Sequence, residues 1–143
     1  MEIVKDEYYV STDKSKLQLD VIHGFLSKSY WAKDIPIEKV NLAIENALCF
    51  GVFHNDMQVG FARVVTDYAV IGYIGDVFIV EEERGKGLSK MLMQHIVDHP
   101  QLQGLRRIVL ATRDAHGLYE QFGFKQLVYP ERWMERPRPN AYT

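Results

Sequence analysis

The chain has 143 residues, of which 47% are hydrophobic and 12% aromatic, and its net charge is −2 at pH 7. This length can bury the core of one domain spanning residues 1–143, and the lone Cys49 excludes an internal disulfide. The interspersed charges argue against nucleic acid as a partner. No 18-residue apolar run or secretory leader is visible, so we expect a cytoplasmic protein that does not contact a membrane.

The first fifty residues predict a strand followed by two helices. Oxygen-bearing side chains at 11–13 can cap a first helix that reaches Leu26, and Pro36 can open the second helix. Tyr30 and Trp31 lie in the break between the two helices. The residues that favour the strand are Ile3, Val4, Tyr8, Tyr9 and Val10.

The middle of the chain predicts consecutive strands. The first two are joined by residues 54–57, whose Asn and Asp suit a tight hairpin turn. A helix that begins at Leu88 should end before Pro100, because the residue that precedes a proline disfavours helical geometry. The strands are expected at 48–53, 59–66 and 68–80.

The last third predicts a short strand at 107–111, a helix capped by Asp114 and a closing strand at 124–128. Residues 137–143, which begin with proline, are expected to form a poorly ordered tail. The predicted order is β, α, α, β, β, β, α, β, α, β. The sequence therefore predicts a mixed α/β (α+β) domain.

The hexapeptide Arg84-Gly85-Lys86-Gly87-Leu88-Ser89 joins the strand at 68–80 to the helix that follows it. Its glycines leave backbone N–H groups uncovered, and a helix N-terminus adds unpaired donors and a partial positive charge, which together favour an anion. An ordinary strand-to-helix turn would have the same composition. The spacing is neither GxxxxGK[ST] nor GxGxxG, so a phosphate held here would belong to another kind of ligand.

Two motifs resemble those of the GNAT superfamily of acetyl-CoA-dependent N-acetyltransferases. Arg84 and Gly87 match its [QR]-x-x-G-x-[GA] signature, with Ser89 where Gly or Ala is usual, and residues 115–124 match its A-x-x-L-Y-x-x-x-G-F spacing. The resemblance covers roughly 52–128. It implies a GNAT-like, mainly antiparallel sheet with a splayed central strand pair, flanked by about four helices.

The resemblance also implies acetyl-CoA as co-substrate and no metal. Main-chain groups at Val77 and Ile79 would pair with the pantetheine arm and polarise the thioester carbonyl. Tyr119 would be the general acid that protonates the departing sulfur, although it could also simply pack in the core. Thr112 stands where many members have Asn. The cofactor residues implied are Val77, Phe78, Ile79, Arg84, Gly85, Lys86, Gly87, Leu88, Ser89, Thr112, Tyr119 and Phe122.

The residues of the acceptor side are argued from their chemistry. Asp76 lies beside the cofactor strand in an apolar setting, where a carboxylate needs either a ligand or a partner such as Arg63. We name it as candidate general base, with His116 or a chain of waters as alternatives. Tyr30 and Trp31, together with Asp76, are the candidate acceptor residues; the two aromatic rings could line a site for a cationic amine or plug the space between helices.

The leading hypothesis is direct transfer of an acetyl group to a primary amine within a ternary complex. The acceptor could be a small-molecule amine or a peptide amine, and the sequence is compatible with a homodimer. The alternative is a non-catalytic or weakly catalytic acyl-CoA sensor or interaction module. An acetyltransferase for tRNA is disfavoured by the near-neutral charge. His95 and His99 have a spacing that could hold a metal, but the C-terminus of the predicted helix explains them.

Overall fold

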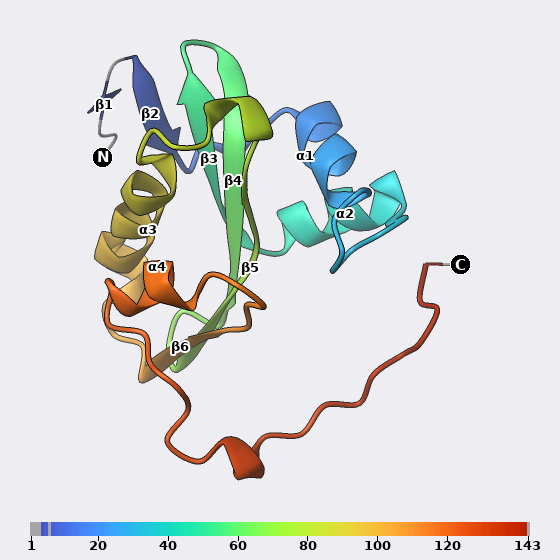
Figure 1. The fold of residues 1–143 in the computed structure, drawn as a ribbon, viewed down its shortest axis with the longest axis vertical. Coiled ribbons are helices and arrows are strands. Elements are labelled where there is room, and N and C mark those ends of the chain that lie inside the picture. Colours follow the sequence, from blue (N-terminus) through green and yellow to red (C-terminus); the bar gives the residue numbers. More distant parts are fainter. Residues whose placement is uncertain (1–3, 6, 143) are drawn as a thin grey trace.

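A computed structural model describes residues 4–5 and 7–142 (Figure 1). One sheet in the order β1-β2-β3-β4-β5-β6 is antiparallel throughout except for the parallel pair β5–β6, which confirms the predicted mixed, mainly antiparallel architecture. The strands are β1 (Val4–Lys5), β2 (Tyr8–Ser11), β3 (Leu48–His54), β4 (Met57–Thr66), β5 (Ile71–Ile79) and β6 (Arg107–Leu110). The α-helices are α1 (Leu19–Leu26), α2 (Ile37–Glu45), α3 (Leu88–Asp98) and α4 (His116–Glu120).

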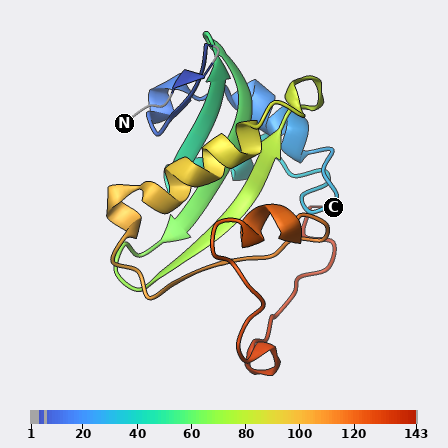
Figure 2. The same cartoon turned by 60° about the vertical axis from the view of Figure 1, so that its left-hand side comes forward.

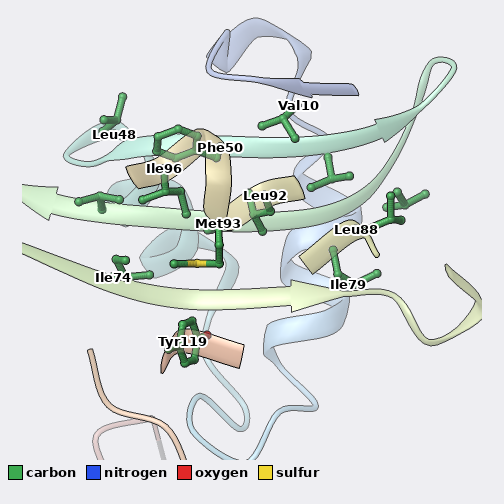
Figure 3. Close-up of a cluster of buried hydrophobic side chains, with 14 of the residues drawn as sticks. Val10, Leu48, Phe50, Ile74, Ile79, Leu88, Leu92, Met93, Ile96 and Tyr119 are labelled. Atoms are coloured by element: carbon green, nitrogen blue, oxygen red, sulfur yellow. The ribbon is translucent and has the colours of Figure 1, made fainter. Parts of the chain in front are cut away.

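Helices cover both faces of the sheet. Helices α3 and α4 lie on one face and α1 and α2 on the other, and the turned view shows α3 crossing the strands obliquely (Figures 1 and 2). Leu92, Met93 and Ile96 of α3 are fully buried, and they face Phe50 and Ile74 of the sheet (Figure 3). Burial of each such side chain contributes roughly 1.5–3 kcal/mol to the free energy of unfolding. Helix α3 and the glycine-containing loop before it therefore have a fixed position on the sheet.

The splayed strand pair is β5 and β6. Their ladder runs from Ile71 opposite Arg107 to Ile74 opposite Leu110, and β5 then continues to Ile79 without a β6 partner. On its other side β5 has a register shift against β4, and Asp76 at this bulge adopts a left-handed backbone with φ 55°. Bulges re-aim side chains and bend a strand, so this one marks the point where β5 leaves its neighbour.

The N-terminal elements differ from the prediction in two places. The expected single first strand is a hairpin of β1 and β2 that turns at Glu7, which has φ 69°; Ile3 lies outside the described residues. The first helix is interrupted: Asp13 caps a 3-10 turn, η1 (Lys14–Lys16), and α1 starts only at Leu19. The interruption has a tertiary cause, because the Gln18 backbone N–H donates to Gln58 of β4 at 2.7 Å.

The closing strand predicted at 124–128 is wrong. Residues 124–127 form no strand and instead line a cavity of about 540 Å³ together with β6. Gly123 has φ 89°, and the Phe124 N–H returns to the Tyr119 carbonyl oxygen at 3.3 Å. This left-handed helix ending redirects the chain, and residues 124–127 then lie across a cavity from β6 without pairing with it.

The predicted Asp114 cap is also wrong. Ala115 is the N-cap of α4, and its backbone N–H donates to the Thr112 hydroxyl oxygen at 3.1 Å. A hydroxyl two residues before Asp114 therefore starts the helix. After α4 come 3-10 turn η4 (Pro130–Arg132) and an irregular segment, whose Tyr142 packs against the cluster under α1 and α2. The prediction of a poorly ordered tail at 137–143 stays a prediction.

The other elements follow the prediction closely. The β3–β4 hairpin turns at Asn55 and Asp56, Pro36 immediately precedes α2, and α3 ends before Pro100. Two further 3-10 turns, η2 (Glu81–Glu83) and η3 (Pro100–Leu102), flank α3. Within the described residues, no helix has the length and apolar character needed to cross a membrane.

Two glycine-to-alanine substitutions should have opposite effects on stability, because Gly60 lies where β4 closely approaches β5 and Gly24 lies beside open space in α1. A Cβ at Gly60 would lie 2.6 Å from Ile79 Cδ1 and 3.0 Å from the Phe78 carbonyl oxygen. We expect Gly60→Ala to lower the free energy of unfolding by roughly 1–3 kcal/mol. Gly24→Ala, in α1 with no atom within 4 Å of the new Cβ, should raise it by about 0.5–1 kcal/mol. Urea denaturation of both variants measures the two values, and an unchanged Gly60→Ala midpoint would contradict the packing described.

Candidate active site

The loop between β5 and α3 has the backbone of an anion site. Gly85 and Gly87 have φ 81° and 79°, and Gly87 is the N-cap of α3. Glycine adopts this left-handed conformation without the steric cost that other residues incur. The first-turn N–H groups of α3 have no partner within the helix, and they add to the partial positive charge of its N-terminus. The predicted loop therefore lies where an anion would be stabilised.

The side chains of this loop have distinct tasks. Arg84 Nε donates to the Ile79 carbonyl oxygen at 3.1 Å, so Arg84 ties the loop to the end of β5. Leu88 is buried in the core and anchors the start of α3. Main-chain groups at Ile79 were expected to pair with the pantetheine arm, and the carbonyl oxygen of Ile79 already accepts this hydrogen bond from Arg84. Ser89 follows in the first turn of α3 and is partly buried.

Lys86 is held by two neighbours. Its Nζ lies 2.6 Å from Glu83 Oε1 and 3.1 Å from the Tyr8 hydroxyl, which itself donates to Glu83. The hydrogen bond to Glu83 is the main reason that the pKa of Lys86 is raised, and the bond from Lys86 is the main reason that the pKa of Glu83 is lowered. These hydrogen bonds hold the Lys86 ammonium group beside the loop, and the group stays charged.

A pocket of about 390 Å³ opens where β5 and β6 part. It brings together six residues that the sequence had singled out: Tyr30, Trp31, Asp76, Val77, Thr112 and Tyr119. They come from the α1–α2 loop, the bulge of β5, the end of β6 and helix α4. The rest of its wall consists of Tyr73, Ile74, Gly75, Leu110, Ala111, Arg113, Asp114 and Ala115.

Tyr119 is the most buried titratable group in the pocket wall, with 8% of its surface exposed. Burial is the main cause of the raised pKa of its phenol, and Tyr30 and Asp114 add to the shift. Its ring packs edge-on against Phe124 at 6.1 Å between centroids. The hydroxyl is therefore a stable proton donor at neutral pH, and the core-packing and donor roles considered from the sequence coexist in one side chain.

Asp76 has a partner on each carboxylate oxygen. Arg63 Nε lies 2.5 Å from Oδ2, and Trp31 Nε1 donates to Oδ1 at 2.8 Å. The Asp76 and Arg63 side chains are only 11% and 22% exposed, so solvent screens the pair weakly. Arg63 is the partner that the sequence suggested as an alternative to a base role. A proton could reach this carboxylate only at an oxygen that already accepts a hydrogen bond.

Aromatic rings form the outer wall of the pocket. Tyr30 and Trp31 meet edge to face at 5.0 Å, and the Arg113 guanidinium lies 3.8 Å above the Tyr30 ring. Arg113 and Asp114, together with Tyr73, were not predicted from the sequence. The sequence signal for Arg113 and Asp114 was modest. They form a charged pair shortly after a short strand that runs parallel to its neighbour, and side chains at the ends of such strands often contact a ligand.

Several residues predicted for the site either lie outside this pocket or have their polar group engaged within the fold. Phe78, Ile79 and Phe122 belong to the core, where Phe78 stacks on Phe25 at 4.1 Å. His116 lines the 540 Å³ cavity on the β6 side of α4 and not this pocket. The Thr112 hydroxyl is engaged as the acceptor at the start of α4.

Two other features of the sequence have structural explanations. Cys49 is buried, and burial raises the pKa of its thiol to about 11, which suits a small core residue better than a nucleophile. Across residues 4–5 and 7–142, no three His, Cys, Asp or Glu side chains gather closely enough to hold a metal ion. The titratable groups of the pocket are therefore the ones to consider for chemistry.

Comparisons with known proteins agree on one family. The model of the acetyltransferase (GNAT) family matches residues 13–124. A Xanthomonas campestris crystal structure assigned to that family has a TM-score of 0.92 and 52% identity, covering 95% of this chain and 96% of that one. A Gibberella zeae protein named as an acetyltransferase is 33% identical, over 80% of this chain and 77% of its own length. An Elizabethkingia anophelis GNAT acetyltransferase with acetyl-CoA bound shares the fold at TM-score 0.66 and 13% identity, covering 95% of this chain and 91% of its own. The chain belongs to the GNAT acetyltransferase family.

Proposed function

We propose that this protein transfers an acetyl group from acetyl-CoA to a primary amine, directly and within a ternary complex. Membership of the family implies acyl transfer from acetyl-CoA, and the amine acceptor is our proposal. The observation that carries it is the buried phenol of Tyr119 in the wall of the pocket between β5 and β6. A buried phenol that stays protonated at neutral pH suits the departure of a thiolate.

The residues present fit acetyl-CoA. The left-handed glycines at 85 and 87, the N-terminus of α3 and the ammonium of Lys86 suit a diphosphate. Beyond Ile74, β5 has no β6 partner, so backbone groups along this edge can pair with a pantetheine arm. Acetyl-CoA would supply the reactive thioester, and the protein would supply its orientation and the proton transfers.

The roles of the side chains follow from their positions. Tyr119 would give its proton to the leaving sulfur, and Asp76 is our candidate to take the proton from the amine. To do so, Asp76 would have to release Trp31 or share Oδ1 with the incoming amine. Tyr30 and Trp31 would line the acceptor site and restrict water. Holding both reactants in one pocket would supply much of the rate enhancement.

The test of the proposed function is free-thiol release across a panel of amines, combined with thermal shifts in acetyl-CoA and in CoA. We expect both nucleotides to raise the melting temperature and at least one amine to release thiol at a rate that depends on its concentration. A sensor or interaction module would bind both nucleotides and release no thiol with any amine. That outcome would contradict the proposed transferase activity and support a sensor or interaction module.

Replacing Tyr119 by Phe should remove the acid and leave binding intact. We expect kcat to fall roughly a hundredfold, with an unchanged Kd for acetyl-CoA by calorimetry. The protonated phenol is the active form, so its raised pKa should move the alkaline decline of kcat above the ordinary value of about 10, and Tyr119→Phe should abolish this limb. Tyr129→Phe, on an exposed tyrosine, is the matched control. Full turnover by Tyr119→Phe would refute the acid role.

A pair of variants separates two roles for Asp76. Asparagine tolerates the left-handed backbone at this position, so Asp76→Asn adds no backbone strain, but it removes both the carboxylate charge and the ion pair with Arg63. We expect kcat/KM at neutral pH to fall roughly a hundredfold. Trp31→Phe, which removes only the donor to Oδ1, should cost less than about tenfold. Equal losses in the two variants would show that Asp76 acts only by positioning Trp31.

A further inference from the structure

We infer that the preferred acceptor carries an anionic group, a carboxylate or a phosphate, besides its amine, and that Arg113 binds this group. The inference rests on the proposed function and names the chemical class of its acceptor. It starts from a cation in the pocket wall that lacks a carboxylate partner among the described residues.

Arg113 joins the two sides of the pocket. It lies three residues after the end of β6, and its guanidinium lies 3.8 Å above the ring of Tyr30, which belongs to the α1–α2 loop. Both residues line the pocket. Arg63 lies outside this wall, where it is paired with Asp76 at 2.5 Å, so it supplies no unpaired cation to the pocket. Arg113 therefore contributes a positive charge that no described acid offsets through an ion pair.

Stacking on Tyr30 leaves Arg113 able to bind an anion. The guanidinium carbon of Arg113 lies 3.8 Å over the centroid of the Tyr30 ring, and a guanidinium in contact with one ring can still direct N–H donors to another partner. Those donors match the geometry of a carboxylate or phosphate, which arginine binds in a bidentate manner. The ring also limits the rotamers of Arg113, so less conformational entropy is lost when an anion binds.

One acid of the pocket suits the other end of the acceptor. Asp114 lines the same pocket and forms no ion pair within the described residues, whereas the charge of Asp76 is already balanced by Arg63. Carboxylates attract an ammonium group before it is deprotonated, whereas Arg113 attracts an anion. A zwitterionic amine satisfies both signs of charge, and a plain alkylamine would leave Arg113 without a counter-ion.

The experiment compares amines that differ only in the anionic group. Tyrosine with tyramine and lysine with cadaverine test a carboxylate, and phosphoethanolamine with ethanolamine tests a phosphate. We expect kcat/KM for the anionic member of at least one pair to exceed that of the neutral member by at least about tenfold, mainly through KM. Arg113→Gln should abolish this preference by lowering kcat/KM for the anionic member more than for its neutral partner, and Arg113→Lys should retain part of the preference.

The matched control is Arg132→Gln. Arg132 also stacks on a tyrosine, Tyr129, at 3.5 Å, but it lies outside the pocket, so the preference should survive. The inference is overturned if the neutral members are equal or better substrates, or if Arg113→Gln slows both members of each pair alike.

Failure of the proposed function would look different. If no amine released thiol, calorimetry of the same pairs on the protein–CoA complex would still test the inference. Binding of an anionic member at least about tenfold tighter than that of its neutral partner, lost in Arg113→Gln, would support it. Equal binding or no binding would overturn it.

Discussion

The ion pair between Arg63 and Asp76 is the contact on which the rest of the site depends. A non-glycine residue in the left-handed region costs on the order of 1–3 kcal/mol, and Asp76 adopts that conformation in the middle of a strand. Its carboxylate is bound by a guanidinium from β4 and by the indole of Trp31. These contacts hold the bulge in place, and the bulge lies where β5 leaves β6. One pair thus stabilises the opening between the strands and positions an aromatic wall beside it.

Strand β5 links the two halves of the site. Its middle contributes Asp76 and Val77 to the pocket, and its end leads into the glycine loop, which Arg84 ties back to Ile79. The buried Leu88 fixes the start of α3 on the same sheet. The anion site and the pocket are therefore connected by the end of β5 and the short 3-10 turn η2, both held on the sheet, which suits a long ligand bound at both ends.

The sequence predicted features that local chemistry determines. The Asn55–Asp56 turn, the start of α3 after two glycines and its end before Pro100 depend on neighbouring residues. The position of Tyr119 followed from a motif. The prediction of a closing strand failed because propensity at 124–128 does not determine whether the segment pairs with an edge, and after Gly123 a cavity separates residues 124–127 from β6. Arg113 was missed because its significance comes from Tyr30, which is distant in the chain and meets it only in the fold.

The outer edge of β6 is a potential site of aggregation if the segment that follows α4 is removed. Within the described residues β6 has a neighbour on one side only, and unpaired strand edges can recruit strands from other molecules. The edge is short, it begins with a charged Arg107, and Phe124 and Leu127 lie across the adjoining cavity. A shortened chain that ended at Gly123 would lose this cover and present the edge to solvent. The segment after α4 thus protects the molecule against edge-to-edge aggregation, although it adds no strand to the sheet.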